Sequence, residues 1–211
     1  MSESNFQTPQ EQFWAGEFGD AYLQRNQGAD LLARKTAHFV RMLDRCERVD
    51  GILELGCNIG LNLVALRTLF PDAALHGLEI NAKAAAAAQE AVPSATIVHG
   101  SILAPPPLTP VDLTMTIGVL IHLNPDALPA AYDTLFHAST NHILVCEYYN
   151  PSPVTVPYRG HSERLYKRDF AGELMERHPS LQLVDYGFLY RRDPLFPADD
   201  TTWFLLRKPN T

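Results

Sequence analysis

The fold is decided by the stretch Gly51-Ile52-Leu53-Glu54-Leu55-Gly56-Cys57-Asn58-Ile59-Gly60-Leu61-Asn62. A short apolar run of aliphatic residues leads into two glycines, Gly56 and Gly60. After Gly60 the apolar residues recur at helical spacing, at Leu63, Leu66, Leu69 and Phe70. The pattern predicts a strand, a tight turn and a helix. Glycines suit such a turn because they tolerate positive φ and let a ligand approach the backbone closely.

A second apolar run, over residues 74–80, carries an acidic residue near its end. This residue, Glu79, follows Gly60 by roughly twenty positions, the separation expected within a βαβ unit. In such a unit the end of the second strand lies beside the first turn, and a carboxylate there can accept hydrogen bonds from two ribose hydroxyls. The first inference is therefore a pocket for a nucleoside-containing cofactor.

The spacing of the glycines bears on which cofactor is bound. A dinucleotide-binding turn reads G-x-G-x-x-G, and Asn58 and Leu61 stand where its second and third glycines would fall, counted from Gly56. These two residues argue against an NAD-type oxidoreductase. Glu54 adds an acidic side chain two residues before Gly56. The simpler alternative is an ordinary βαβ turn with Glu79 on the surface.

These features resemble the acidic-x-Gly-x-x-x-Gly signature of class I S-adenosylmethionine (SAM) methyltransferases. The resemblance implies that SAM is the cofactor and S-adenosylhomocysteine (SAH) the product. It also implies that the acidic residue and the glycine loop hold the amino-acid end of SAM, while the second-strand acid holds the ribose. The cofactor-binding residues predicted in this way are Glu54, Gly56, Asn58, Gly60, Glu79, Ile80, Ile117 and Gly118.

Composition sets outer bounds on the function. The 211 residues carry a net charge of −7, which disfavours nonspecific binding to nucleic acid. The three cysteines are widely spaced and show no ligand spacing with the eight histidines, so neither a metal site nor a disulfide framework is expected. No apolar run approaches a membrane span and the N-terminus lacks a signal-peptide core, so a cytoplasmic protein is expected. The oligomeric state stays open.

The N-terminal region predicts a lid. Residues 1–12 are polar and are expected to fray. Residues 13–26 are rich in aromatic side chains and predict a helix outside the nucleotide-binding core. Many SAM methyltransferases cover the cofactor with such a helix, and Tyr22 and Arg25, three residues apart on one helical face, are expected to contact its methionine end. The alternative is that the aromatic residues only pack this helix onto the domain. Residues 30–46 then predict an amphipathic helix.

The middle of the chain continues the alternation of strands and helices. Residues 82–91 are mostly alanine and predict a closely packed helix without chemistry. Residues 95–99 predict the third strand, followed by Gly100-Ser101-Ile102. The resembled family often has Gly-Asp here, with the Asp on the adenine amino group. In this chain the Ser101 hydroxyl or the backbone at Ile102 is expected to recognise the adenine instead.

The fourth and fifth strands, within residues 111–123 and 141–149, point to the reacting end of the site. Both are expected to end at the edge of the sheet where α/β proteins bind ligands. His122 falls just past the fourth strand and is the predicted catalytic base, ahead of Glu147 and Tyr148. The alternative is a structural histidine, which is the more common role of a lone His.

A Pro-rich stretch over residues 150–170 predicts a long functional loop. It holds four of the 17 basic residues of an acidic chain, and guanidinium groups suit bidentate binding of carboxylate or phosphate. Arg164 and Arg168 are expected to share a helical face. The alternative is a solvated loop whose cations pair with neighbouring acids. The residues predicted to bind the acceptor are Tyr148, Tyr149, Tyr158, Arg159, His161, Arg164 and Arg168.

A narrower resemblance covers almost the whole chain. The runs FWAGEFGDAYLQRN (13–26), LELGCNIGLNL (53–63) and EYYNPSPVTVPYRGHSERLYKRDFAGE (147–173), with DYGF (185–188) and TTWFLL (201–206), resemble the pseudaminic-acid-biosynthesis-associated methylases. The resemblance implies an α/β Rossmann-like fold: a seven-stranded, mostly parallel sheet of order 3-2-1-4-5-7-6 with strand 7 antiparallel and helices on both faces. One domain is expected, with a lid (1–47), a cofactor-binding core (48–146) and an acceptor loop, helix and C-terminal hairpin (147–211).

The function expected from these observations is SAM-dependent methyl transfer to a small anionic metabolite, for example a nonulosonic sugar or its nucleotide-activated form. Two alternatives are kept. One is a SAM-binding accessory protein without turnover, against which the polar stretch 147–170 argues. The other is the NAD-type oxidoreductase, against which the glycine spacing argues.

Overall fold

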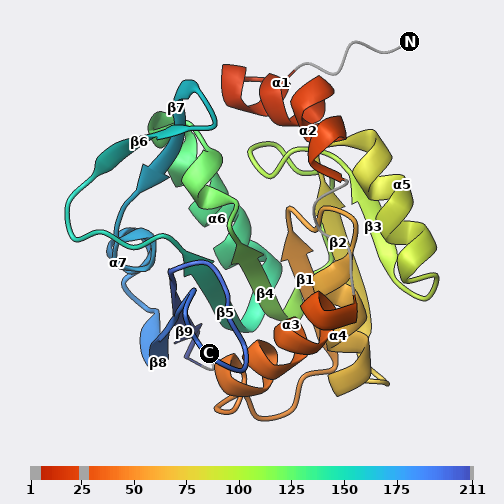
Figure 1. Cartoon of the computed structure of the whole chain (residues 1–211). Coiled ribbons are helices and arrows are strands. Elements are labelled where there is room, and N and C mark those ends of the chain that lie inside the picture. The colour runs from red at the N-terminus through yellow and green to blue at the C-terminus, as the bar shows by residue number, and fades with distance from the viewer. Residues whose placement is uncertain (1–5, 24–28, 210–211) are drawn as a thin grey trace.

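The fold is known from a computed structural model, which describes residues 6–23 and 29–209 (Figure 1). Seven strands form one sheet in the order β3-β2-β1-β4-β5-β9-β8. Neighbouring strands from β3 to β5 are parallel, whereas β9 runs antiparallel to both β5 and β8. Without the separate hairpin β6–β7, this is the predicted order 3-2-1-4-5-7-6 with an antiparallel strand 7. The predicted fold is confirmed.

The central strand β1 (Gly51–Leu55) is buried at every position, as expected for an apolar run flanked by parallel neighbours. Its neighbours bring their carboxyl ends to the same edge of the sheet. The other strands of the sheet are β2 (Ala74–Glu79), β3 (Thr96–His99), β4 (Val111–Ile117), β5 (Ser139–Glu147), β8 (Gln182–Leu189) and β9 (Thr201–Arg207).

Helices cover both faces of the sheet and divide the core in two. The helices α3 (Ala29–Met42), α4 (Leu61–Leu69) and α5 (Ala82–Ala91) pack on one face, and α6 (Leu128–Ala138) and α7 (Phe170–Arg177) pack on the other. The alanines of α5 allow a close approach, because a Cβ at Gly60 would lie 3.1 Å from the Cα of Ala88. The alanine-rich segment therefore packs as its composition predicts.

The N-terminal region differs from expectation. Residues 1–12 were expected to fray, yet helix α1 already begins at Pro9 (Pro9–Ala15), and α2 (Glu17–Tyr22) follows after Gly16. The physical reason is a capping box: Thr8 caps the helix, and the Glu11 side chain returns to the Thr8 backbone. The single helix predicted over 13–26 is therefore wrong in its bounds. The predicted contact of Arg25 lies outside the described residues.

The stretch 150–170 is also different, because much of it forms a β-hairpin. Strands β6 (Val154–Tyr158) and β7 (His161–Lys167) pair antiparallel around Arg159 and Gly160, both of which have positive φ. The interpretation of Arg164 and Arg168 as a helical pair is wrong, since Arg164 belongs to β7. In Figure 1 this hairpin and helices α1 and α2 lie over the same edge of the sheet.

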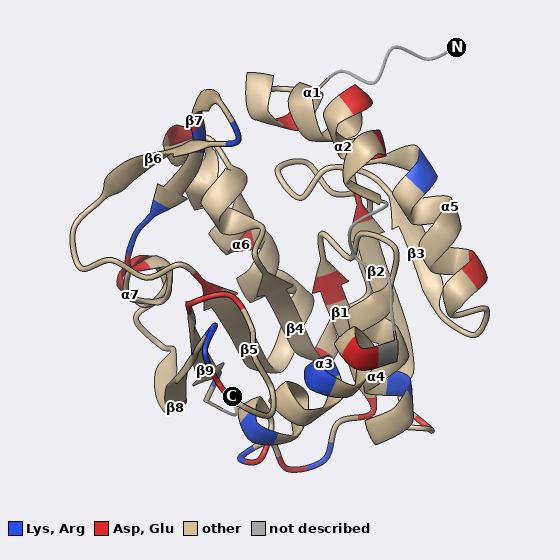
Figure 2. Ribbon diagram, viewed as in Figure 1, with Lys and Arg blue, Asp and Glu red and all other residues tan. Residues whose placement is uncertain are grey.

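The described residues hold neither a membrane-spanning helix nor a cluster of metal ligands. No helix within 6–23 and 29–209 is long and apolar enough to cross a membrane. The same residues hold no group of three or more His, Cys, Asp or Glu side chains placed to bind a metal ion. Figure 2 shows an acidic position at the tip of β1 and basic positions on α3 and β7.

Candidate functional site

A cavity of about 730 Å³ opens at the carboxyl edge of the sheet, a volume typical of small-molecule sites. It has two chemically different ends. The acidic end is lined by Glu11, Gly56, Asn58, Glu79, Ile80, Ser101 and Ile102. The tyrosine end is lined by Tyr22, His122, Tyr148, Tyr158, Arg159, Arg191 and Asp199. Ile117 and Gly118, at the end of β4, also line it, and no atom lies within 4 Å of a Cβ built on Gly118.

The turn after β1 is held against the end of β2. Gly56, Asn58 and Gly60 all have positive φ, which glycine adopts at little cost. The Asn58 backbone N–H donates to Oε2 of Glu79 and the Asn81 backbone N–H donates to Oε1, each at a distance of 2.8 Å. Burial raises the pKa of Glu79, and these two hydrogen bonds oppose the rise. Each carboxylate oxygen keeps a lone pair with which it can accept a further hydrogen bond.

Glu54 lies behind the cavity wall rather than in it. Its Oε1 accepts a hydrogen bond from Asn62 at 2.5 Å, and Asn62 in turn accepts one from the Lys35 ammonium at 2.7 Å. Burial raises the pKa of Glu54 to about 7 and lowers that of Lys35. Oε2 of Glu54 is buried without a hydrogen-bond partner in the described part of the chain. Asn62 and Lys35 themselves line the cavity.

The hydroxyl of Ser101 is engaged by the N-terminal helix. It donates to Oε1 of Glu11 through a short hydrogen bond and accepts one from the Leu103 N–H at 3.0 Å. Its single hydrogen is therefore used, while one acceptor position remains. Glu11 is 3% exposed and lines the cavity. Glu11 was not among the predicted site residues, although the spacing T-x-x-E indicates an ordered helix start.

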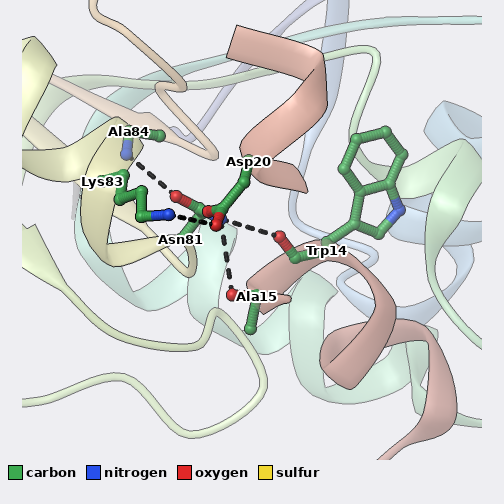
Figure 3. A network of polar contacts seen from close by, with 6 residues as sticks. All are labelled: Trp14, Ala15, Asp20, Asn81, Lys83 and Ala84. Atoms are coloured by element: carbon green, nitrogen blue, oxygen red, sulfur yellow. Dashed lines mark hydrogen bonds and ion pairs between the residues drawn. The ribbon is translucent and has the colours of Figure 1, made fainter. Parts of the chain in front are cut away.

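The N-terminal helices are fastened over the acidic end by a polar network (Figure 3). Asn81, two residues after Glu79, donates to the Trp14 and Ala15 carbonyls and to Asp20, while its own oxygen caps α5. Lys83 forms an ion pair with Asp20 at 2.5 Å. A side chain at Gly19 would collide with the Trp14 carbonyl. Helices α1 and α2 are therefore fastened to the residues that follow Glu79.

His122 lies at the meeting point of the lid, the hairpin and β4. Its Nδ1 lies 2.6 Å from the Arg164 carbonyl, which can only accept, so Nδ1 carries the proton. Burial lowers the pKa of His122 to about 4, which keeps the imidazole neutral with a lone pair on Nε2. The rings of Trp14 and Tyr158 lie 4.6 and 4.9 Å from it, centroid to centroid.

Glu147 positions the segment that carries His122. Its carboxylate accepts hydrogen bonds from the Val119, Leu120 and Ile121 N–H groups at 3.0 to 3.4 Å. Burial raises its pKa to about 7. Glu147 is 2% exposed and does not line the cavity, so it acts as an anchor for the 3-10 turn Leu120–His122 and is a poor candidate for a base.

The tyrosine end joins three distant segments. Burial and the nearby Asp199 carboxylate raise the pKa of Tyr148. Burial, together with Tyr158 and Asp199, raises the pKa of Tyr22. The Arg159 guanidinium lies over the Tyr158 ring, 5.4 Å from its centroid. The lid, the hairpin and the turn before β9 therefore meet in one cluster of hydroxyl and charged groups.

The predicted acceptor residues fall into two groups. Tyr148, Tyr158 and Arg159 line the cavity. Arg168 instead pairs with Glu173 at 2.8 Å beside Tyr149, around a separate small depression. Arg164 lies over the Phe13 ring, and His161 packs against Phe13 and Phe18. Cavity residues that the sequence analysis missed include Glu11, Arg34, Lys35, Arg191 and Asp199.

Known methyltransferases share a domain match and the fold with this chain. Residues 52–140 match the family model described as a methyltransferase domain. The chain resembles magnesium protoporphyrin IX methyltransferase from Synechocystis PCC 6803 with bound SAH, with a TM-score of 0.71 and 13% identity over 94% of this chain and 97% of that one. No curated protein sequence matches the chain.

Two further solved structures share the fold. A SAM-dependent methyltransferase from Clostridium acetobutylicum has a TM-score of 0.64 and 10% identity, covering 90% of this chain and 97% of that one. The glycopeptide N-methyltransferase MtfA complexed with sinefungin has the same TM-score and identity, covering 83% and 87%. At these identities the structures establish the fold alone. Residues 52–140 match a methyltransferase domain, and the whole chain has the Rossmann-like fold of these SAM-dependent methyltransferases.

Proposed function

We propose that this protein is a SAM-dependent methyltransferase that acts on a small anionic metabolite bound at the tyrosine end of the cavity. The observation that carries the proposal is the charge of the lining. Arg34, Arg159 and Arg191 line the cavity, and besides Glu11 and Glu79 at the acidic end Asp199 is the one carboxylate among its described lining residues. One cation can meet the carboxylate of SAM, which leaves others for the acceptor. Charge-assisted hydrogen bonds to a carboxylate or phosphate suit this arrangement.

Methyl transfer from SAM depends more on aligning the two reactants than on activating either of them. The methyl group of SAM is already activated by the sulfonium, and its transfer to the acceptor is an in-line displacement, so most of the rate can come from orientation. In our proposal Glu79 binds the ribose hydroxyls, the turn at Gly56 and Asn58 takes the amino-acid end, and Glu54 acts through Asn62. The Nε2 lone pair of His122 accepts the proton of a hydroxyl acceptor.

Acceptors differ widely among proteins with this fold. The names of two structural neighbours specify a magnesium porphyrin and a glycopeptide as substrates. The acceptor is therefore argued from the site of this chain rather than from its fold. A nonulosonic sugar or its nucleotide-activated form combines an anionic group with hydroxyls, which fits the tyrosine end. The resemblance to pseudaminic-acid-associated methylases points to the same class.

The test is turnover with labelled SAM. The full chain is incubated with labelled SAM and with pairs of acceptors, each pair being an anionic sugar acid and its methyl ester. We expect label in the acid and at least tenfold weaker use of the ester, because the ester cannot make charge-assisted bonds. Equal use of acid and ester would contradict the anionic class. Binding of SAM without transfer to any metabolite fraction would favour the accessory protein.

A further inference from the structure

We propose that Glu11, on the N-terminal helix α1, is a cofactor-binding residue that recognises the amino group of adenine. The proposal rests on SAM as the cofactor and is independent of the proposed acceptor. It assigns the adenine specificity of the enzyme to its lid rather than to the loop after β3. Glu11, on a distant segment, would then accept the hydrogen bond that an acidic residue at position 101 could otherwise accept from adenine.

The first step places the adenine. With the ribose on Glu79, the base extends along the cavity towards β3, which neighbours β2 at the edge of the sheet. That part of the cavity is lined by Ile80 and Ile102, whose side chains offer apolar surface to a flat ring, and by Ser101 and Glu11. An amino group on the ring needs an acceptor, because burying it unpaired costs free energy.

One oxygen of the Glu11 carboxylate remains able to accept a hydrogen bond from the adenine amino group. Oε2 of Glu11 already accepts from the Gln7 and Thr8 N–H groups at 2.7 and 2.8 Å. Oε1 accepts the hydrogen of Ser101, and a carboxylate oxygen can accept two hydrogen bonds. The Ser101 hydroxyl has given its only hydrogen to Glu11. The carboxylate is therefore both oriented by Ser101 and able to accept from the adenine.

The burial of the Glu11 carboxylate calls for a role beyond helix capping. Within the described residues Glu11 forms no ion pair, and its 3% exposure leaves it little contact with water. Capping alone could be met from a solvated position, since a capping box needs only local backbone groups. The contact with Ser101, ninety positions along the chain, is what a ligand-recognising carboxylate needs to be fixed in place.

The proposal also links the two ends of the cavity. The neighbouring residue Gln10 donates to the Glu163 carbonyl of the hairpin at 3.4 Å, and its own oxygen is buried without a partner in the described part of the chain. Helix α1 thus contacts the loop after β3 through Glu11 and the hairpin through Gln10. Cofactor binding through Glu11 would hold α1 where it completes the tyrosine end.

The test compares SAH with S-inosyl-L-homocysteine. In the second ligand a carbonyl replaces the adenine amino group and N1 carries a hydrogen, so the Glu11 variant is what assigns the difference to the amino group. Calorimetry on the full chain is expected to give at least tenfold tighter binding of SAH by wild type, because a site built to accept a hydrogen bond rejects the analogue that lacks the donor. In Glu11→Gln that preference is expected to fall to about twofold or less.

Two further variants separate recognition from helix stability. Thr8→Ala weakens the cap but leaves the carboxylate, so it is expected to lower the melting temperature and retain the preference for SAH. Glu11→Gln/Ser101→Asp moves the carboxylate to position 101 and is expected to restore the preference. Equal binding of both ligands by wild type, or an unchanged preference in Glu11→Gln, would overturn the proposal. So would loss of the preference in Thr8→Ala, which would make Glu11 a capping residue only.

Discussion

The two ends of the cavity are built on different principles. At the acidic end, Glu79 is buried and is held by backbone N–H groups from the turns that follow β1 and β2. At the tyrosine end, Arg159 and Asp199 are exposed and come from a hairpin and a loop. The first end is part of the folded core, and the second is a cluster of side chains at the surface above it.

Because of this difference, we expect the residues that bind the cofactor to tolerate substitution less well than those that bind the acceptor. Altering Glu79 or Glu54 removes buried hydrogen bonds to the turns after β1 and β2 and to helix α4, so the acidic end is constrained by stability as well as by binding. Side chains of the tyrosine end sit on connections that tolerate substitution. We therefore expect the cofactor to depend on few, deeply buried contacts and the acceptor to depend on several exposed ones.

The largest effect is expected at His122, a buried residue of the tyrosine end. In His122→Asn the amide can still donate to the Arg164 carbonyl, but no lone pair remains at the Nε2 position. We expect turnover of a hydroxyl acceptor to fall by about 10²-fold or more, the usual size of a general-base contribution. The measurement is kcat at saturating SAM and acceptor.

The control for His122 is SAH affinity, which is expected to stay near that of wild type. Since burial lowers the pKa of His122 to about 4, the wild-type imidazole should remain neutral, and kcat should not depend on its titration between about pH 6 and 8. Full turnover by His122→Asn at saturating acceptor would leave the residue with a packing role only.

The next effect concerns the ribose. Glu79→Gln keeps one acceptor oxygen but replaces the other by an N–H₂ group, which cannot accept from Asn58, Asn81 or a ribose hydroxyl. We expect SAM binding to weaken by about 2 kcal/mol, roughly thirtyfold, the cost of unpaired buried polar groups. Calorimetry with a deoxyribose analogue of SAH supplies the control: loss of a hydroxyl should weaken binding to wild type far more than to the variant. Equal losses in both would remove Glu79 from the ribose site.

A smaller effect is expected at the tyrosine end. Arg159→Ala should raise the KM for an anionic acceptor by about tenfold, with SAM binding little changed. Arg168→Ala is the matched control, because Arg168 is paired with Glu173 away from the cavity. Steady-state kinetics of both variants would sharpen the comparison of the two ends. If Arg168→Ala had the larger effect on KM, the acceptor would bind outside the cavity described above.

The same comparison explains what the sequence could predict. Glu54, Gly56 and Glu79 lie at fixed offsets along a βαβ unit. Because the pattern of such a unit is local in sequence, their offsets predicted that they lie close together in space. The order and direction of the seven strands were confirmed as a whole. The place of Arg159 at the cavity edge could be expected only because it follows a strand of the sheet by a short stretch.

The remaining site residues depend on contacts between distant segments. Lys35 looks like any polar position on an amphipathic helix until Asn62 and Glu54 are brought beside it. Glu11 was assigned to a fraying tail because the capping box was overlooked, and its contact with Ser101 spans ninety positions. The hairpin was not predicted because three prolines and a glycine interrupt residues 150–160, which hides the alternation of Val154 and Val156. No spacing rule reaches across such separations.

The smallest effect is the pH dependence set by Glu54. Because burial raises its pKa to about 7, the carboxyl is largely protonated in the free enzyme below that pH and ionised above it. SAM carries a net positive charge, so it binds the ionised form better and releases the proton. Affinity for SAM should therefore rise by about fivefold between roughly pH 6 and pH 8, since one proton allows at most tenfold per pH unit. Calorimetry in buffers of different ionisation enthalpy would measure the released proton.

Glu54→Gln is the matched variant, since its amide oxygen can still accept from Asn62. Its SAM affinity should be flat over the same pH range. Stability has the opposite sign: a pKa raised in the folded state stabilises the protein at low pH, and this contribution is lost as the pH rises through about 7. Glu54→Gln should therefore melt above wild type at pH 8 and lose that advantage near pH 5. A wild-type affinity that does not change with pH would mean that SAM leaves Glu54 uncharged, and the acidic end would then bind its cofactor through Glu79 and Glu11 alone.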